Sequence, residues 1–380
     1  MMDITEEQKM IREMVGKLAR DKIGPLAKEA DASGHSSPEI ISHLAENDLL
    51  KIGLPEKYGG IFANYYTTAL VVEEMARVDG SAAMTLFVTQ TLIHILNQWG
   101  SEEQKDRFFG EMRSGDKINA FSLTEPNYGS ESASIQTKAV LDGDHYRING
   151  TKIFVTNGEI ADFILVFVRT GEGERQRGIS ALVVEKGVPG FRVGKHEDKL
   201  GFRGSDLNEL IFEDAKVPKE NLIGRPGGGW DVLRTSAADI RAYGPGALAV
   251  GLAQGALDYA VDYAKQRMQF GNPISNFQAI RFMLADMAIQ IEAARQLVYK
   301  AAVMVDEDDR DKTLFASMAN CFATDVGVKV TNDAMQVLGG YGYIKDHPME
   351  QKMRDARLLQ VVEGTNQIQR VIVARRLLES

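Results

Sequence analysis

The spacing of hydrophobic residues changes twice along this chain, and these changes limit the possible fold more than any other feature. Residues 1–118 show helical spacing, as in YYTTALVVEEMARV at 65–78, where charged residues are expected on the solvent side. Residues 119–225 contain short β-branched and aromatic runs separated by turns, such as DFILVFVRT at 162–170. Helical spacing then returns, as in FQAIRFMLADMAIQIEAARQLVYKAA at 277–302. We therefore expect helices, then strands, then helices.

This order predicts separate structural units, because 380 residues exceed the length of most single compact domains. The short strands in the middle suggest a small barrel or sandwich, and the long helical pattern after residue 277 favours a bundle. Within HYRINGTKIFVTNG at 145–158, the pairs Asn149-Gly150 and Asn157-Gly158 predict turns. The expected fold class is α+β with several domains.

Charge and cysteine content argue against several classes of protein. The net charge is −9 and no long basic tract occurs, so nucleic-acid binding is not expected. No apolar run approaches the roughly 20 residues of a membrane helix, so no membrane partner is expected. The single cysteine, Cys321, excludes an intrachain disulfide; with the early acidic residues it favours a cytoplasmic protein without a transit peptide. The histidines are scattered, and no CxxC or HExxH pattern predicts a metal site.

Several polar residues beside turns or glycines could contact a cofactor. Thr124 and Thr156 could each donate a hydroxyl to a ring nitrogen or carbonyl, or could simply cap a turn. Arg267 could clamp a phosphate or cap the helix before it. The segment QVLGGYGYIKD at 336–346 could let the backbone approach a ligand or end a helix. Because it does not follow a strand, it is not a dinucleotide fingerprint.

Glu363 is the candidate catalytic residue, since it follows two valines and precedes a Gly-Thr pair in VVEGT at 361–365. Burial among apolar neighbours would raise its pKa, and a carboxylate with a raised pKa is a better general base near neutrality. An exposed glutamate at a helix start is the alternative.

The motifs taken together, and in this order, resemble those of the acyl-CoA dehydrogenases over essentially the whole chain. They are LTEP…GS, KIFVTNG, RGSD, R-x-x-FG, ADM, Q-x-x-GGxG, MRDA and EGT-x-Q-x-Q-R. The resemblance implies an N-terminal α-helical domain at 1–118, a middle β-barrel at 119–228 and a C-terminal four-helix bundle at 229–380. It also implies FAD as cofactor, an acyl-CoA substrate, a homotetramer built as a dimer of dimers, and electron-transferring flavoprotein as the electron acceptor.

The resemblance implies roles for individual residues by their motif positions. Flavin-ring contacts are expected from Phe121, Leu123, Thr124, Phe154 and Thr156. Further FAD contacts, some to the cofactor of a neighbouring subunit, are expected from Arg267, Phe270, Gln278, Gln336, Gly340, Thr365 and Gln367. Substrate contacts are expected from Ser130, Arg241, Tyr243, Val362 and Gly364. Glu363 would remove the α-proton of the thioester while the β-hydrogen leaves as hydride to flavin N5.

Departures from the family pattern bear on the acyl group. Val362 stands where many members have tyrosine, which leaves room near the reacting carbons. Arg241 falls, in an ungapped count, where some members place an alternative base; a one-residue insertion would instead align it with a common arginine. We expect a branched, cyclic or aryl acyl group, with Arg241 either pairing with a second carboxylate, as in benzylsuccinyl-CoA, or serving a structural or phosphate-facing role. Ala82 disfavours glutaryl-CoA, since glutaryl-specific members carry an arginine there.

Other functions compatible with the resemblance are an acyl-CoA oxidase, a reductive enoyl-CoA reductase, and a non-catalytic flavin- or CoA-binding protein. Oxidases of this kind are usually longer, and the retained Glu363 and Thr156 argue against a non-catalytic role. The reductive direction stays open.

Overall fold

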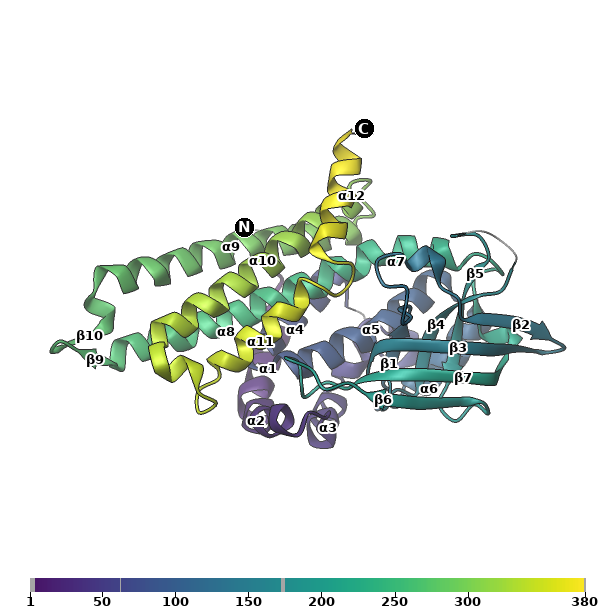
Figure 1. Cartoon of the computed structure of the whole chain (residues 1–380), viewed down its shortest axis with the longest axis horizontal. Helices are drawn as coiled ribbons and strands as arrows, with labels where there is room; N and C mark the ends of the chain where they lie inside the picture. The colour runs from purple at the N-terminus through teal and green to yellow at the C-terminus, as the bar shows by residue number, and fades with distance from the viewer. Residues whose placement is uncertain (1–3, 62, 172–174, 379–380) are drawn as a thin grey trace.

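The computed structural model describes residues 4–61, 63–171 and 175–378, in which a helical region, a sheet region and a second helical region follow one another (Figure 1). This order confirms the expected fold class.

The first region contains six α-helices within the described residues. They are α1 (Glu6–Leu18), α2 (Gly24–Ser33), α3 (Pro38–Glu46), α4 (Tyr65–Val78), α5 (Gly80–Trp99) and α6 (Glu102–Met112). Thr5 and Ser101 begin α1 and α6 with complete capping boxes, which satisfy backbone N–H groups left free in a first helical turn. Nearly every residue of α4 and α5 is buried, so these two helices form the centre of the region.

The expectation that the charges of α4 face solvent is wrong for Glu73 and Glu74, which are 3% and 5% exposed. Glu73 accepts hydrogen bonds from Arg295 Nε at 2.9 Å and Tyr299 Oη at 2.7 Å. These partners come from a helix more than 200 residues later, so the pattern around Glu73 alone could not reveal them. Helices pack on both sides of α4, and paired charges replace solvent there.

The middle region is one curled sheet of eight strands. They are β1 (Asn119–Ser122), β2 (Lys138–Asp142), β3 (His145–Thr156), β4 (Phe163–Arg169), β5 (Ile179–Glu185), β6 (Phe191–His196), β7 (Leu207–Pro218) and β8 (Leu222–Ile223). Their order is β6-β7-β3-β2-β4-β5-β8, with β1 parallel to β4. Strands β5 and β7 also contact each other across the curl, so the sheet encloses its own apolar core.

The turn predicted at Asn149-Gly150 is wrong, because β3 runs straight through this pair. Gly150 lies at a register shift between β3 and β7, and a Cβ there would come within 2.6 Å of Thr137 Oγ1. Glycine is needed here for close approach rather than for a hairpin. The turn predicted at Asn157-Gly158 is confirmed, with Asn157 at φ 64°.

The C-terminal region packs long helices side by side. They are α7 (Gly229–Tyr243), α8 (Pro245–Gln266), α9 (Gln278–Asp306), α10 (Lys312–Leu338), α11 (Met349–Leu359) and α12 (Asn366–Leu378). A short hairpin of β9 (Met268–Gln269) and β10 (Asn272–Pro273) joins α8 to α9 at the end opposite the sheet (Figure 1). Among the described residues, no helix is both long and apolar enough to cross a membrane.

Candidate active site

Glu363 lies in the loop between α11 and α12 and is partly buried, so it is not an exposed helix-start glutamate. Its backbone is left-handed at φ 55°, and Gly364 follows at φ 84°. A left-handed glutamate costs on the order of 1–2 kcal/mol, so the surrounding structure must hold it in place. Glycine at the next position lets the chain continue this sharp turn without further strain.

Side chains from two other elements hold this loop. Arg241 Nε on α7 and Gln369 Nε2 on α12 each donate to the Glu363 carbonyl oxygen at 3.0 Å. Gln369 Nε2 also donates to the Gly364 carbonyl oxygen at 2.8 Å. Asn366 ties the start of α12 to α10, because its side chain donates to Asp325 Oδ1 at 2.8 Å. The strained residue is therefore fixed by donors to its own main chain.

The Glu363 carboxyl group is set toward its neutral form. Burial raises its pKa, and the nearby positive charge of Arg241 opposes that rise only in part. The same burial lowers the pKa of Arg241. Arg241 Nη2 would lie 3.4 Å from a Cβ added to Gly364, so the guanidinium group lies against the turn itself. This position and the bond from its Nε give Arg241 a role in holding the loop.

Tyr243 sits deeper than expected for a residue that touches substrate. It is completely buried, and its ring lies 5.0 Å from His94 and 5.5 Å from Phe87. Its hydroxyl is 3.5 Å from Thr91 Oγ1. Burial lowers the pKa of His94 to about 4, so this imidazole is neutral at physiological pH. Tyr243 therefore belongs to a buried aromatic cluster, whereas Val362 is half-buried in the loop itself.

The residues expected at a flavin ring come together where β1 ends beside β3. Ile153 N–H donates to the Thr124 carbonyl at 3.0 Å, which joins the two segments. Phe154 lies at a register shift with φ 56°, and its side chain is 57% exposed. Phe121 and Leu123 on one segment and Thr124 and Thr156 beside them are half-buried. This bulge exposes a large aromatic ring on segments that also carry the hydroxyl groups of Thr124 and Thr156, residue types suited to a flat heteroaromatic ligand.

A buried ion pair, which the sequence did not indicate, supports this segment. Lys152 Nζ lies 2.8 Å from Glu125 Oε1, and their side chains are 0% and 5% exposed. Lys152 Nζ also donates to the Leu123 carbonyl oxygen at 2.9 Å. Burial alone would raise the pKa of Glu125, but Lys152 and backbone N–H donors lower it overall. Glu125 lies in the motif LTEP and Lys152 in the motif KIFVTNG, each close to a residue expected to contact the flavin. This closeness in the sequence was the only signal that could have pointed to the ion pair.

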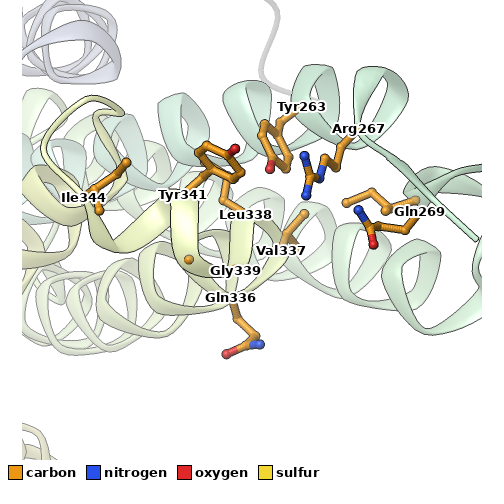
Figure 2. Close-up of a pocket in the computed structure, with 11 residues that line it drawn as sticks. Tyr263, Arg267, Gln269, Gln336, Val337, Leu338, Gly339, Tyr341 and Ile344 are labelled. Carbon is orange, nitrogen blue, oxygen red and sulfur yellow. The ribbon is translucent and has the colours of Figure 1, made fainter.

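A separate cavity of about 420 Å³ is lined by residues of α8, β9, α10 and the segment 339–344 (Figure 2). It contains Arg267, Gln336 and Gly340, three residues predicted to contact FAD. The Arg267 guanidinium carbon lies 5.2 Å from the centre of the Tyr341 ring, and no ion pair of Arg267 is seen in the described part of the chain. A Cβ on Gly340 would meet no atom within 4 Å, so the loop faces open space. The cavity thus offers a cation, an aromatic face and open backbone.

The remaining predicted residues lie outside this cavity. Phe270 is 91% exposed at the β9–β10 turn, and Gln278 is exposed at the first residue of α9. Gln367 is exposed on α12, while Thr365 Oγ1 accepts a backbone N–H of that helix at 3.3 Å. Ser130 is exposed in the loop after β1. These side chains are available to a ligand or to another chain, apart from the Thr365 hydroxyl, which already caps a helix.

The two candidate ligand regions belong to different parts of the molecule. In Figure 1 the sheet that carries Phe154 and Thr156 is at one end, and the β9–β10 hairpin beside the cavity is at the other. The helices α8, α9 and α10 extend between them (Figure 1). One chain therefore does not surround both regions.

Comparison with known proteins matches the three regions in turn. Models of the N-terminal, middle and C-terminal domains of acyl-CoA dehydrogenases match residues 5–116, 120–215 and 227–378. A cyclohex-1-ene-1-carbonyl-CoA dehydrogenase from Geobacter metallireducens is 44% identical over 381 residues, covering 100% of both chains.

Solved structures agree with these matches. The structure of butyryl-CoA dehydrogenase from Megasphaera elsdenii is similar with a TM-score of 0.96 at 40% identity, covering 100% of both chains. A chain from a structure described as the electron transferring flavoprotein of Acidaminococcus fermentans has a TM-score of 0.97 at 44% identity, also covering 100% of both chains.

Proposed function

The chain belongs to the acyl-CoA dehydrogenase family, and from that premise we propose how its own residues carry out the reaction. It is a flavin oxidoreductase that acts on acyl-CoA thioesters, and its cofactor is FAD. The reaction is α,β-dehydrogenation to the 2-enoyl-CoA, with Glu363 as the base.

The residues present fit FAD at two places. The exposed Phe154 ring and the hydroxyls of Thr124 and Thr156 suit the flavin end. Arg267, stacked on Tyr341 in the cavity of Figure 2, suits the diphosphate, because guanidinium groups bind phosphate bidentately. Bound FAD supplies the acceptor for the β-hydride.

We infer that two chains contribute to each cofactor site, since the cavity with Arg267 lies beside the β9–β10 hairpin, at the end of the chain opposite the sheet. This supports a homotetramer built as a dimer of dimers. Exposed apolar side chains on α9, Phe282 at 58% and Ile289 at 66%, add a surface that another copy could cover. A single-chain mass in solution for FAD-loaded protein would contradict this assignment.

Glu363 removes the α-proton in this mechanism. Its raised pKa makes the carboxylate a stronger base, and the donors from Arg241 and Gln369 fix the loop so that the carboxyl group keeps one orientation. In the described residues no hydrogen bond uses the Glu363 backbone N–H. This N–H can therefore donate to the thioester oxygen and stabilise the charge that develops as the proton leaves.

The observation that carries the proposal is the strained, tightly held loop with a base of raised pKa. We expect anaerobic bleaching of the bound flavin by a panel of acyl-CoAs, slowed about 100- to 10,000-fold or more in Glu363→Gln. Glu307→Gln, at an exposed position on the end of α9, is the matched control and should bleach at the wild-type rate. Equal rates for Glu363→Gln and wild type, with FAD bound in both, would remove Glu363 as the base.

For the acyl group we propose a branched, cyclic or aryl chain. Val362, rather than an aromatic residue, precedes the base, which supports a wider pocket. The cyclohex-1-ene-1-carbonyl-CoA dehydrogenase from Geobacter metallireducens supports a cyclic group at 44% identity; the butyryl-CoA dehydrogenase from Megasphaera elsdenii supports a straight chain at 40%. Because Arg241 Nε already binds the Glu363 carbonyl, a second carboxylate, as in benzylsuccinyl-CoA, would have to use the other guanidinium nitrogens.

Turnover of butyryl-, isobutyryl-, cyclohexanoyl- and benzylsuccinyl-CoA separates these substrates. Fastest turnover of butyryl-CoA would contradict the proposal of a bulky acyl group, but it would not affect the proposal that Glu363 is the base.

We propose electron-transferring flavoprotein as the electron acceptor, supported by the similarity to a chain in a structure described under that name. Substrate-reduced enzyme should then react slowly with air and quickly with that partner. Fast reaction with air would favour an oxidase, and rapid reduction of the enoyl-CoA product by an electron donor would favour the reductive direction.

A further inference from the structure

Four side chains able to bind a metal ion meet between the N-terminal helices and the sheet, apart from the residues assigned to the reaction. His35 follows α2, Glu159 lies in the turn after β3, His196 ends β6, and Asp206 directly precedes β7. One ligand atom from each lies within 4.8 Å of the others. No metal site was expected from the sequence because only local patterns such as CxxC and HExxH were sought. These four residues lie in separate segments and form no such pattern.

His196 is oriented as a metal ligand would be. Its Nε2 lies 2.9 Å from the Gly34 carbonyl oxygen, and because a carbonyl can only accept, Nε2 must carry the proton. In the neutral ring Nδ1 is then left with a lone pair, and this atom is buried without a hydrogen-bond partner. Metal-binding histidines typically donate their second ring N–H to a carbonyl in this way. This buried lone pair is free to bind a cation.

Asp206 is 3% exposed and faces both imidazoles, whose ring centres lie 4.2 Å apart. Its Oδ1 is 3.7 Å from His35 Nδ1 and 3.8 Å from His196 Nδ1, and it accepts Ser36 N–H at 3.1 Å. Tetrahedral zinc with bonds of about 2.0–2.1 Å places its ligand atoms about 3.4 Å apart. The two nitrogens therefore need to approach Asp206 by only a few tenths of an ångström.

The charges nearby are compatible with a divalent ion. Two carboxylates would neutralise it, and the two rings would bind in their neutral forms. Lys199 and Arg203 are cations close to this cluster. Burial lowers the pKa of Lys199, although Asp206 opposes this, and Arg203 is already paired with Asp198 at 2.5 Å.

We propose that His35, Glu159, His196 and Asp206 bind one divalent transition-metal ion of the zinc class, which joins the loop after α2 to the sheet. Two imidazoles and two carboxylates suit zinc better than magnesium or calcium, which prefer oxygen ligands alone. The ion would be structural, because all four positions of a tetrahedral ion come from the protein.

Zinc binding to FAD-loaded, tag-free protein after chelator treatment tests the site. Calorimetry should give one zinc per chain, and the melting temperature should rise by about 3 °C at free zinc 100-fold above the dissociation constant. Cobalt(II) should give the intense visible bands of a tetrahedral site, measured as a difference spectrum against the flavin.

His35→Ala is the main variant because His35 is 59% exposed and its loss should leave the fold intact. We expect it to weaken zinc binding at least 10-fold and to abolish the thermal shift, with Asp206→Asn weakening it further. His145→Ala, an exposed histidine at the start of β3, is the control and should bind as wild type does. No stoichiometric zinc on the wild type, or equal binding by wild type and His35→Ala, overturns the proposal.

Discussion

Burial shifts the pKa values of two carboxylates, the buried Glu125 and the partly buried Glu363, but their surroundings move these values in opposite directions. Glu125 pairs with the ammonium group of Lys152 at 2.8 Å and accepts two backbone N–H groups, so its pKa is lowered. Glu363 has its hydrogen-bonding partners on its main chain instead, and burial raises the pKa of its carboxyl group. Burial alone therefore does not decide what a carboxylate does. The donors around the carboxyl oxygens decide it: they make Glu125 a structural anion, whereas the Glu363 carboxyl group, with its raised pKa, suits the proposed role of a base.

Removing the partner of Glu125 should give the largest loss of stability. Lys152→Met leaves a buried carboxylate without its cation and should lower the free energy of unfolding by about 3–5 kcal/mol, measured by urea denaturation. It should also weaken FAD binding, because Lys152 holds the Leu123 carbonyl beside the residues proposed to contact the flavin ring. The double variant Lys152→Met, Glu125→Leu should recover most of the lost stability. A single variant as stable as wild type would show that the pair does not support this segment.

Loosening the Glu363 loop should mainly affect rate. Gln369→Leu removes two hydrogen bonds to the Glu363 and Gly364 carbonyls and should slow flavin bleaching about 10- to 100-fold. Stability should change by roughly 1 kcal/mol, because the loop itself is short. Val371→Ala, at an exposed position on the same helix, should match wild type in stopped-flow bleaching. A Gln369→Leu enzyme with wild-type rate would mean that the loop does not need this support.

The pH dependence of stability should differ in sign between the two carboxylates. The folded-state pKa of Glu363 is raised, so its contribution is largest at low pH and falls as pH rises from its unfolded value through the raised one. Glu363→Gln should therefore melt higher than wild type at pH 7–8, with the difference shrinking toward pH 4. The folded-state pKa of Glu125 is lowered, so its contribution is lost only as pH falls through that value. Melting curves of Glu363→Gln that track wild type at every pH would contradict this contrast.

Much of the fold could be predicted from the sequence because hydrophobic periodicity is a local signal. The order of helices and strands follows from the spacing of hydrophobic residues close together in the sequence. The Asn149-Gly150 turn failed because glycine serves close packing against Thr137 there, and a pair of residues cannot show which use applies.

The candidate site could be predicted only in part. Motifs marked Glu363 and Gly364 correctly as a sharp turn, which the positive φ angles confirm. The contact of Arg241 with the Glu363 carbonyl depends on a break between α7 and α8 at Gly244, and a one-residue ambiguity in that region hid it. His35, Glu159, His196 and Asp206 come from segments up to 171 residues apart in the sequence. Their closeness can therefore be seen only in the folded structure.

The most direct test is the pH dependence of anaerobic flavin bleaching by the best acyl-CoA, measured in wild type, Arg241→Gln and Glu363→Gln. The wild-type rate should rise with pH through a midpoint above the ordinary range of a glutamate. That midpoint should move higher in Arg241→Gln, because Arg241 lowers the pKa of Glu363. In Glu363→Gln the rise of the bleaching rate with pH should disappear, and only a slow, pH-independent rate should remain. If Glu363→Gln bleached the flavin at the wild-type rate and with the wild-type pH dependence, the assignment of Glu363 as the base would be contradicted.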